Sequence, residues 1–368
     1  MSPRRAMVPL AAYLLALPGC GARAPASAPP PTAAASPASP AATPAPVRAI
    51  GAGDPSGSVI SREPWPFEDA QGQVIRTRAF SLYTTETHHL IVDRLPGFLE
   101  AALNHFTTAL GPLPPPAARL DTFVMASRAQ WQRLTLRMLG PAGVPVTYIE
   151  RGGFTHAGRA YLFDIGAADT FSIASHEGWH QFSQSTFRQR LPLCLEEGVA
   201  AFMEGHRWLG SDVVFLGWAN LERFDRLREA ASRPGGLLTL DQLFDSSPGA
   251  LLSRGQAGPL TYYAQCWAFV HFLREGENGA HSHGFRRLVA DAAGGHLMQF
   301  VAARLKIAPG ARQGVTFGPT PAQVIRAYID PDLDRLQRAF DEFQRRIIRT
   351  GGRDAVIEGR SPLTTAGR

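Results

Sequence analysis

The sequence has almost no lysine. Lys306 is the single lysine among 368 residues, so arginine carries nearly all of the positive charge, and the formal net charge is +6. The basic residues are scattered, and neither a dense basic tract nor a nucleic-acid-binding motif occurs. The charge therefore indicates a solvated surface and argues against a nucleic-acid partner.

Cysteine and long apolar runs are also scarce. The three cysteines are Cys20, Cys194 and Cys266, and the absence of any C-x-x-C pattern excludes the common thiolate zinc sites. Cys194 and Cys266 could form one disulfide or remain two buried thiols. The apolar run at 7–17 is too short to cross a bilayer. With 45% hydrophobic residues, the chain is otherwise typical of a soluble globular protein with a full core.

The N-terminus has the pattern of a signal segment. Arg4 and Arg5 precede the apolar run, which ends in Leu17-Pro18-Gly19-Cys20. This ending resembles a bacterial lipobox. The resemblance implies removal of residues 1–19, attachment of a lipid to Cys20, and a protein held in the bacterial cell envelope by acyl chains.

Composition divides the rest of the chain into three parts. Residues 20–59 are rich in alanine and proline, with little apolar bulk, and predict a disordered tether of polyproline-like character. Residues 60–350 have the hydrophobic pattern of a folded domain. The tail at 351–368 has little to pack and is expected to be disordered.

Hydrophobic periodicity predicts an α+β fold, in which a small mixed sheet lobe at 60–168 precedes a mostly helical lobe at 169–350. In the first lobe, strands are expected at 77–83, 89–92 and 120–126, and helices at 95–110 and 128–139. Gly152 and Gly153, followed by 159–165, predict a hairpin or edge strand. After residue 187 the pattern is helical, with helices expected at 195–205, 219–231, 239–244, 261–275, 285–293, 296–305, 321–329 and 331–350.

An H-E-x-x-H motif lies in the helix predicted at 169–187. Residues four apart stand one above the other on a helix, so His176 and His180 can converge on one metal ion. Catalytic zinc typically takes three protein ligands and keeps a fourth position for water. Glu177, beside the first histidine, is placed to accept a proton from that water.

A second helix is expected after a turn near Pro192. On this helix Glu197 and Glu204 share one face, whereas Glu196 is predicted to point elsewhere. Gly198 has no side chain, which predicts a close approach of this helix to the motif helix.

The motifs on these two helices resemble those of a known protein family. H-E-x-x-H followed by E-G-x-A-x-x-x-E is similar to the gluzincin zinc metallopeptidases, and most closely to bacterial peptidase-MA-like domains. The resemblance implies a zincin-like fold and a bound Zn²⁺. By this resemblance, His176, His180 and Glu197 are the zinc ligands and Glu177 is the general base. Tyr263 would donate a hydrogen bond to the oxyanion, and Glu204 would orient a ligating histidine. Tyr262 adjoins Tyr263 and is the competing tyrosine.

These observations predict a membrane-anchored, zinc-dependent metallopeptidase. Its substrate would be a peptide or protein, and Glu177 would activate the attacking water. Two alternatives remain open. One is a non-catalytic zincin-fold envelope lipoprotein that acts in binding or assembly, and the other is an amidase that cleaves cell-wall peptides.

Overall fold

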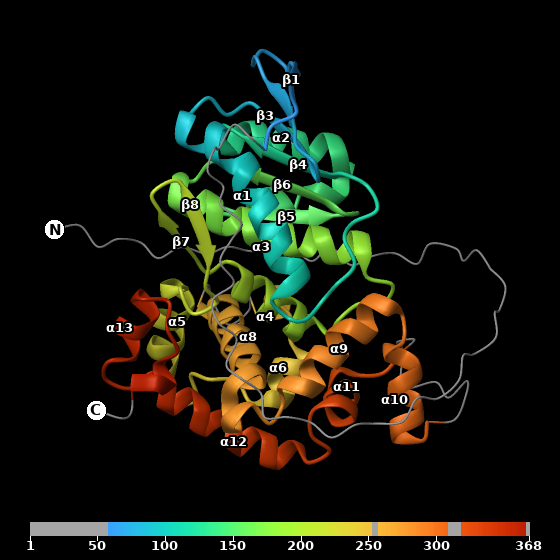
Figure 1. Ribbon diagram of the computed structural model, residues 1–368, viewed down its shortest axis with the longest axis vertical. Coiled ribbons are helices and arrows are strands. Elements are labelled where there is room, and N and C mark those ends of the chain that lie inside the picture. Colours follow the sequence, from blue (N-terminus) through green and yellow to red (C-terminus); the bar gives the residue numbers. More distant parts are fainter. Residues whose placement is uncertain (1–57, 252–256, 308–317, 366–368) are drawn as a thin grey trace.

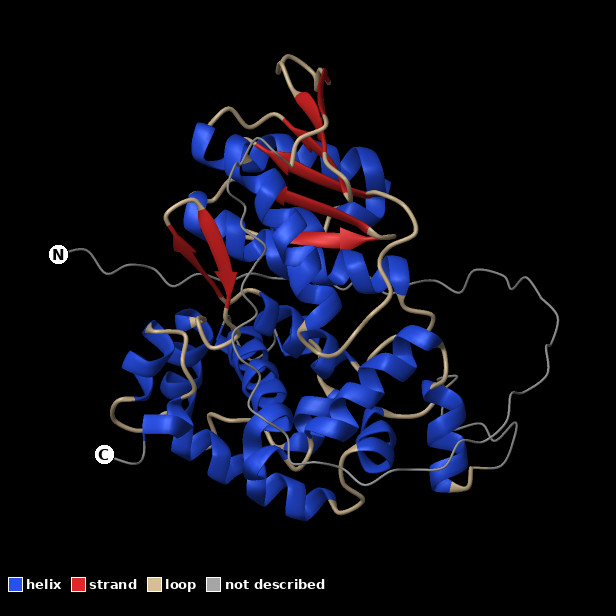
Figure 2. Cartoon of the chain, in the orientation of Figure 1, coloured by secondary structure: helices blue, strands red, loops and turns tan. Residues whose placement is uncertain are grey.

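A six-stranded mixed sheet forms one end of the molecule, and helices form the other (Figures 1 and 2). The computed structural model describes residues 58–251, 257–307 and 318–365. The predicted signal segment, Cys20 and the tether up to residue 57 lie outside the described residues. The α+β prediction is confirmed, because the sheet belongs to the N-terminal region and the C-terminal part is mostly helical.

The sheet has the strand order β1-β2-β3-β4-β6-β5, and β3, β4 and β6 run parallel. The strands are β1 (Ser61–Pro64), β2 (Gln73–Arg76), β3 (Phe80–Thr84), β4 (Leu120–Met125), β5 (Gly153–His156) and β6 (Arg159–Phe163). The hairpin predicted from Gly152 and Gly153 is confirmed as β5 and β6, and β5 is an edge strand.

Helices cover both faces of this sheet. Side chains alternate between the faces of a strand. Val124 and Leu162 therefore face the main core with α1 (His89–Thr108), while Phe123 and Tyr161 belong to a second cluster with α2 (Arg128–Leu139). The prediction for 128–139 matches α2. The strand predicted at 89–92 is wrong, because this segment is the first turn of α1.

The second part of the molecule contains the remaining helices. They are α3 (Ala167–Thr186), α4 (Leu193–Met203), α5 (Leu221–Ala231), α6 (Leu240–Asp245), α7 (Pro248–Leu251), α8 (Ala257–Glu275), α9 (Ser282–Gly294), α10 (Leu297–Leu305), α11 (Pro321–Tyr328), α12 (Leu333–Ile347) and α13 (Gly352–Ile357). No helix among the described residues combines the length and the apolar character needed to cross a bilayer.

One prediction for this part was incomplete and one was wrong. A hairpin, β7 (His206–Leu209) and β8 (Asp212–Phe215), lies between the helices predicted at 195–205 and 219–231, where no element was predicted. The segment from Gly351, expected to be disordered, contains α13, and Val356 of that helix is buried in the main core.

Helix α4 lies at the centre of the fold, against α3 on one side and α8 on the other. A Cβ atom at Gly198 would lie 2.4 Å from the carbonyl oxygen of Cys266, so glycine is required for the close approach of α4 and α8. The predicted close approach is therefore present, but its partner is α8 and not the motif helix. Cys194 and Cys266 are both buried free thiols.

Candidate metal centre

Helix α3 carries the H-E-x-x-H motif into the interior. Its start is fixed by Asp164, whose carboxylate accepts hydrogen bonds from the Gly166 backbone N–H and the Thr170 hydroxyl. The regular turns that follow place His176 and His180 on one face, each 2% exposed. Their Nε2 atoms lie 3.2 Å apart.

Glu197 of α4 completes a triangle with the two imidazoles. Its Oε2 atom lies 3.4 Å from the Nε2 atoms of both His176 and His180. Glu197 is fully buried, yet neither carboxylate oxygen accepts a hydrogen bond from any residue that the structure describes. Burial favours the neutral acid, but the neighbouring His180 and His176 lower the pKa of Glu197 to about 2. These three residues form a group with the spacing of metal ligands.

The Nδ1 atom of His176 contacts an ionic network. His176 Nδ1 lies 2.6 Å from Glu204 Oε1, and the same carboxylate accepts hydrogen bonds of 2.6 Å from Arg223 Nη2 and Asn220 Nδ2. Burial favours protonation of Glu204, but Arg223 and His176 outweigh it and lower the pKa of Glu204 to about 2. Glu204 is therefore an anion clamped from α5 and its N-terminal cap.

The Nδ1 atom of His180 contacts a smaller hydrogen-bonded group. His180 Nδ1 lies 3.0 Å from Glu196 Oε1, and the Ser183 hydroxyl donates a 2.6 Å hydrogen bond to the same oxygen. The prediction that Glu196 points elsewhere is therefore wrong. Glu196 and Glu204 support the two imidazoles from one helix, on either side of Glu197.

This network determines where the imidazole protons lie. Burial opposes protonation of His176 and His180, but the neighbouring carboxylates outweigh it and raise the pKa of both. Metal binding requires the neutral rings, and in these a carboxylate at Nδ1 favours the tautomer that carries its proton there. Both Nε2 lone pairs and a carboxylate oxygen of Glu197 then converge on one point. Such an electron-rich, buried arrangement is suited to a cation.

Glu177 lies on the motif helix beside this point. Thr155 of β5 donates a 2.8 Å hydrogen bond to Glu177 Oε2 and a 3.0 Å hydrogen bond to the Glu177 backbone carbonyl. Burial raises the pKa of Glu177. A Cβ atom at Gly153 would lie 2.3 Å from Leu162 and 3.3 Å from Glu177, so β5 packs against the motif helix only because position 153 has no side chain.

Tyr263 rather than Tyr262 is the tyrosine that lies against the His176 ring. Tyr263 lies within α8, 1% exposed, and its ring centroid is 6.1 Å from that of His176. The guanidinium carbon of Arg223 is 5.2 Å from the Tyr263 ring centroid. Tyr262 is also buried, beside Tyr263.

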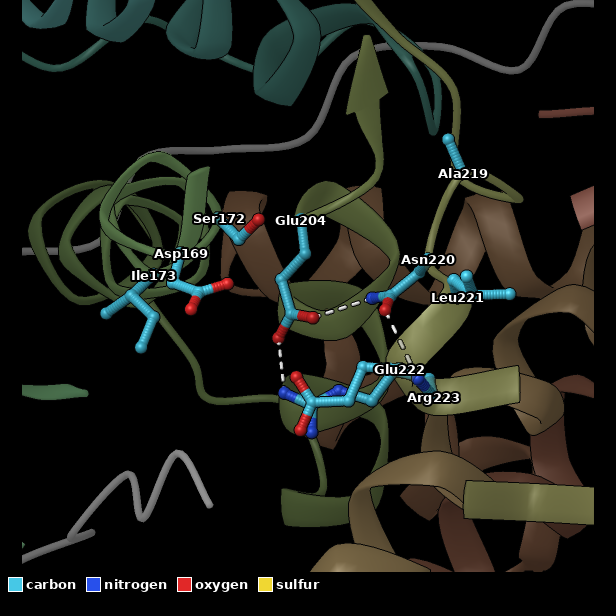
Figure 3. A pocket seen from close by; sticks show the side chains of 9 residues that line it. All are labelled: Asp169, Ser172, Ile173, Glu204, Ala219, Asn220, Leu221, Glu222 and Arg223. Atoms are coloured by element: carbon cyan, nitrogen blue, oxygen red, sulfur yellow. Dashed lines mark hydrogen bonds and ion pairs between the residues drawn. The ribbon is translucent and has the colours of Figure 1, made fainter. Parts of the chain in front are cut away.

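A cavity of about 190 Å³ adjoins the His176 side of the centre (Figure 3). It is lined by Asp169, Ser172 and Ile173 of α3, by Glu204, and by residues 219–223 at the start of α5. Figure 3 shows Glu204 between the α3 residues and the 219–223 segment, with its carboxylate bonded to Asn220 and Arg223.

The structure thus brings together the residues that the sequence singled out, and adds others. His176, His180, Glu197, Glu177, Glu204 and Tyr263 all lie at or beside the centre. Sequence reasoning missed Glu196, Ser183, Asn220, Arg223 and Thr155. The Glu196-Glu197 pair and a helix-cap asparagine at 220 were the available signals, but neither indicates a partner.

Comparisons with protein-family models, curated proteins and solved structures gave no match to this chain.

Proposed function

We propose that this protein is a zinc-dependent metallopeptidase anchored in the bacterial cell envelope. The observation that supports it most is the triangle of His176 Nε2, His180 Nε2 and Glu197 Oε2, with sides of 3.2, 3.4 and 3.4 Å. Ligands at about 2.0–2.1 Å from a tetrahedral zinc are separated by about 3.3–3.4 Å. The triangle therefore has the dimensions of one face of a zinc coordination shell.

The chemistry of the donors fits zinc as well. Imidazole nitrogen suits Zn²⁺, whereas Mg²⁺ and Ca²⁺ prefer oxygen ligands. Within the described residues the buried Glu197 carboxylate accepts no hydrogen bond and has only the two imidazoles beside it, so a bound cation would stabilise it. Zn²⁺ held by these three residues would supply a bound water with a pKa of about 7 and would polarise a carbonyl group.

Glu177 performs the proton transfers in this proposal. Its carboxylate accepts a proton from the attacking water and later donates it to the leaving amine. The Thr155 hydrogen bond holds one carboxylate oxygen in place, which leaves the other for the water. Tyr263, beside His176, is the candidate donor to the carbonyl oxygen as negative charge develops there.

The position of β5 supports a peptide or protein substrate. This strand pairs only with β6 in the sheet, and its residue Thr155 touches Glu177. An extended peptide can add to such an edge by main-chain hydrogen bonds. The substrate backbone would then run past Glu177. The envelope location rests on Cys20 and the segment before it.

Metal analysis combined with peptide-library cleavage tests this function. The comparison is between the wild type and Glu177→Gln, with Glu229→Gln as the matched control because Glu229 lies exposed on α5. We expect one zinc per chain in all three proteins. Glu177→Gln should lose about 10²- to 10⁴-fold in cleavage rate, and Glu229→Gln should be unchanged.

Other results would redirect or refute the proposal. Full activity of Glu177→Gln would remove Glu177 as the base. One bound zinc without cleavage of any peptide would favour a binding role in the envelope. Cleavage of cell-wall peptides alone would favour an amidase.

A further inference from the structure

We propose that the cavity beside His176 binds a cationic side chain of the substrate, such as lysine or arginine, with Glu222 as its counter-charge. This inference rests on the proposed peptidase function and names a substrate class for it. It assigns a specificity-determining role to Glu222.

The cavity lies beside the metal centre. Ile173 in its wall and His176 are three residues apart on α3, so they share a face of that helix. Glu204 lines the cavity and contacts His176 Nδ1. Glu204 thus separates the cavity from the ligand triangle, and the proposal places a substrate residue near the cleaved bond in the cavity while the bond itself lies at the centre.

The charges in the lining do not balance. Asp169 is paired with Arg151 at 2.7 Å, and Glu204 is paired with Arg223 at 2.6 Å. Glu222 is the third carboxylate, and within the described part of the chain it forms no ion pair. One negative charge is therefore uncompensated.

Glu222 is also poorly solvated. Its Oε1 atom is buried and accepts no hydrogen bond from the residues that the structure describes. Burial raises the pKa of Glu222, and the charges of Arg223 and Arg226 oppose this rise only in part. Both guanidinium groups are engaged elsewhere, Arg223 with Glu204 at 2.6 Å and Arg226 with Glu229 at 2.7 Å. Glu222 is half-buried, and a buried carboxylate oxygen without a partner is unfavourable, so a cation that enters the cavity gains an interaction with Glu222.

The apolar parts of the lining suit the stem of such a side chain. Ile173 and Leu221 line the cavity together with the polar residues. Lysine and arginine place their methylene groups on apolar surface and their charge on polar groups. A leucine side chain would leave Glu222 without a partner, and an acidic side chain would be repelled by Glu222 and Asp169.

An anion is the competing occupant, because Arg223 is 1% exposed and its Nε and Nη1 atoms have no hydrogen-bond partners. The Glu204 carboxylate, however, already balances its charge, and an anion would stand next to three carboxylates. The balance of charge therefore favours a cationic ligand.

Cleavage of matched peptides tests the inference. The zinc-loaded wild type should prefer lysine or arginine over leucine at one position flanking the cleaved bond, by about tenfold or more in kcat/KM. Glu222→Gln should lose most of that preference by weakening the lysine peptide. Glu222→Arg should favour aspartate or glutamate at the same position. The control Glu63→Gln, which changes an exposed carboxylate on β1, should match the wild type.

Direct binding separates failure of this inference from failure of the proposed function. Calorimetry with zinc-loaded Glu177→Gln should show tighter binding of the lysine peptide than of its leucine counterpart, and this difference should vanish in Glu177→Gln/Glu222→Gln. Loss of cleavage with this binding difference intact refutes only the peptidase. Equal binding of the two peptides, a preference that survives Glu222→Gln, or an acidic preference in the wild type overturns the cationic site.

Discussion

The two histidines of the motif are supported in different ways. His176 is held by Glu204, which is bonded to Arg223 and Asn220 from outside α3 and α4. His180 is held by Glu196, whose other contact is the hydroxyl of Ser183 on α3 itself. One arm is a charged network that joins three segments of the chain, and the other is a local hydrogen-bonded pair.

This difference indicates that the contacts that orient a candidate ligand histidine need not be the contacts that stabilise the fold. A carboxylate on Nδ1 is sufficient to fix the tautomer and orientation of an imidazole. In the His180 arm, Glu196 supplies this carboxylate, and the Ser183 hydroxyl is its one further partner among the described residues. The His176 arm adds a buried guanidinium, which depends on Glu204 for its neutralisation. Damage to the two arms should therefore have unequal consequences.

The largest effect is expected for Glu204→Gln. Glutamine keeps the shape and an acceptor for His176, but it leaves the Arg223 guanidinium buried without a counter-charge in contact. We expect a loss of about 3 kcal/mol in the free energy of unfolding. Urea denaturation with a chelator present measures this loss without the contribution of bound metal.

The double variant Glu204→Gln/Arg223→Met is the control for that mechanism. It removes both charges, so it should be more stable than Glu204→Gln alone. If Glu204→Gln lowers the free energy of unfolding no more than Glu196→Gln does, the distinction between the two arms is wrong.

An intermediate effect is expected for Glu196→Gln. The His180 imidazole keeps an acceptor but loses its ionised partner, and zinc affinity should fall about 10- to 100-fold. Because no buried guanidinium depends on Glu196, the free energy of unfolding without metal should change by only about 1 kcal/mol. Competition with a fluorescent chelator measures the affinity, and Ser183→Ala should produce a smaller change in the same direction. Loss of stability equal to that of Glu204→Gln would show that the two arms are equivalent.

The smallest effect concerns a histidine with no carboxylate support. His105 packs between Phe202 and Phe215, its Nε2 atom makes no hydrogen bond, and burial together with Arg274 lowers the pKa of His105 from 6.5 to about 3. The unfolded chain binds this proton near pH 6.5 while the folded chain does not. The stabilisation is therefore present above pH 6.5 and is lost as the pH falls toward 3.

Between pH 7.5 and 5.5 this loss should be about 1 kcal/mol. His105→Phe keeps a ring between Phe202 and Phe215 and removes the titration, so its stability should fall less over the same interval. Urea denaturation of both proteins at the two pH values, with chelator, measures the difference. Equal slopes would show that His105 is not kept neutral by the fold.

Much of the centre followed from spacing within single helices. The convergence of His176 and His180 follows from their separation of four, and the shared face of Glu197 and Glu204 follows from their separation of seven. The contacts of Glu196 could not be predicted from helical spacing, because an imidazole ring has a nitrogen on each of two sides. His180 directs Nε2 toward Glu197 and Nδ1 toward Glu196, which a helical wheel of α4 alone cannot represent.

Tertiary contacts also account for what the sequence analysis missed in the fold. Arg223 and Asn220 reach Glu204 only because the β7–β8 hairpin returns the chain, and no periodicity spans that interval. The β-branched residues Ile91 and Val92 favoured a strand, but burial along one face of α1 overrides that preference.

The contact of α4 with α8 has a consequence for the proposed centre. Gly198 is not itself a candidate ligand, but a methyl group there would collide with the Cys266 carbonyl oxygen and displace α4 together with Glu197. Protein–zinc distances vary by only about 0.2 Å. If the centre holds zinc as proposed, its geometry therefore depends on a neighbouring residue that has no side chain.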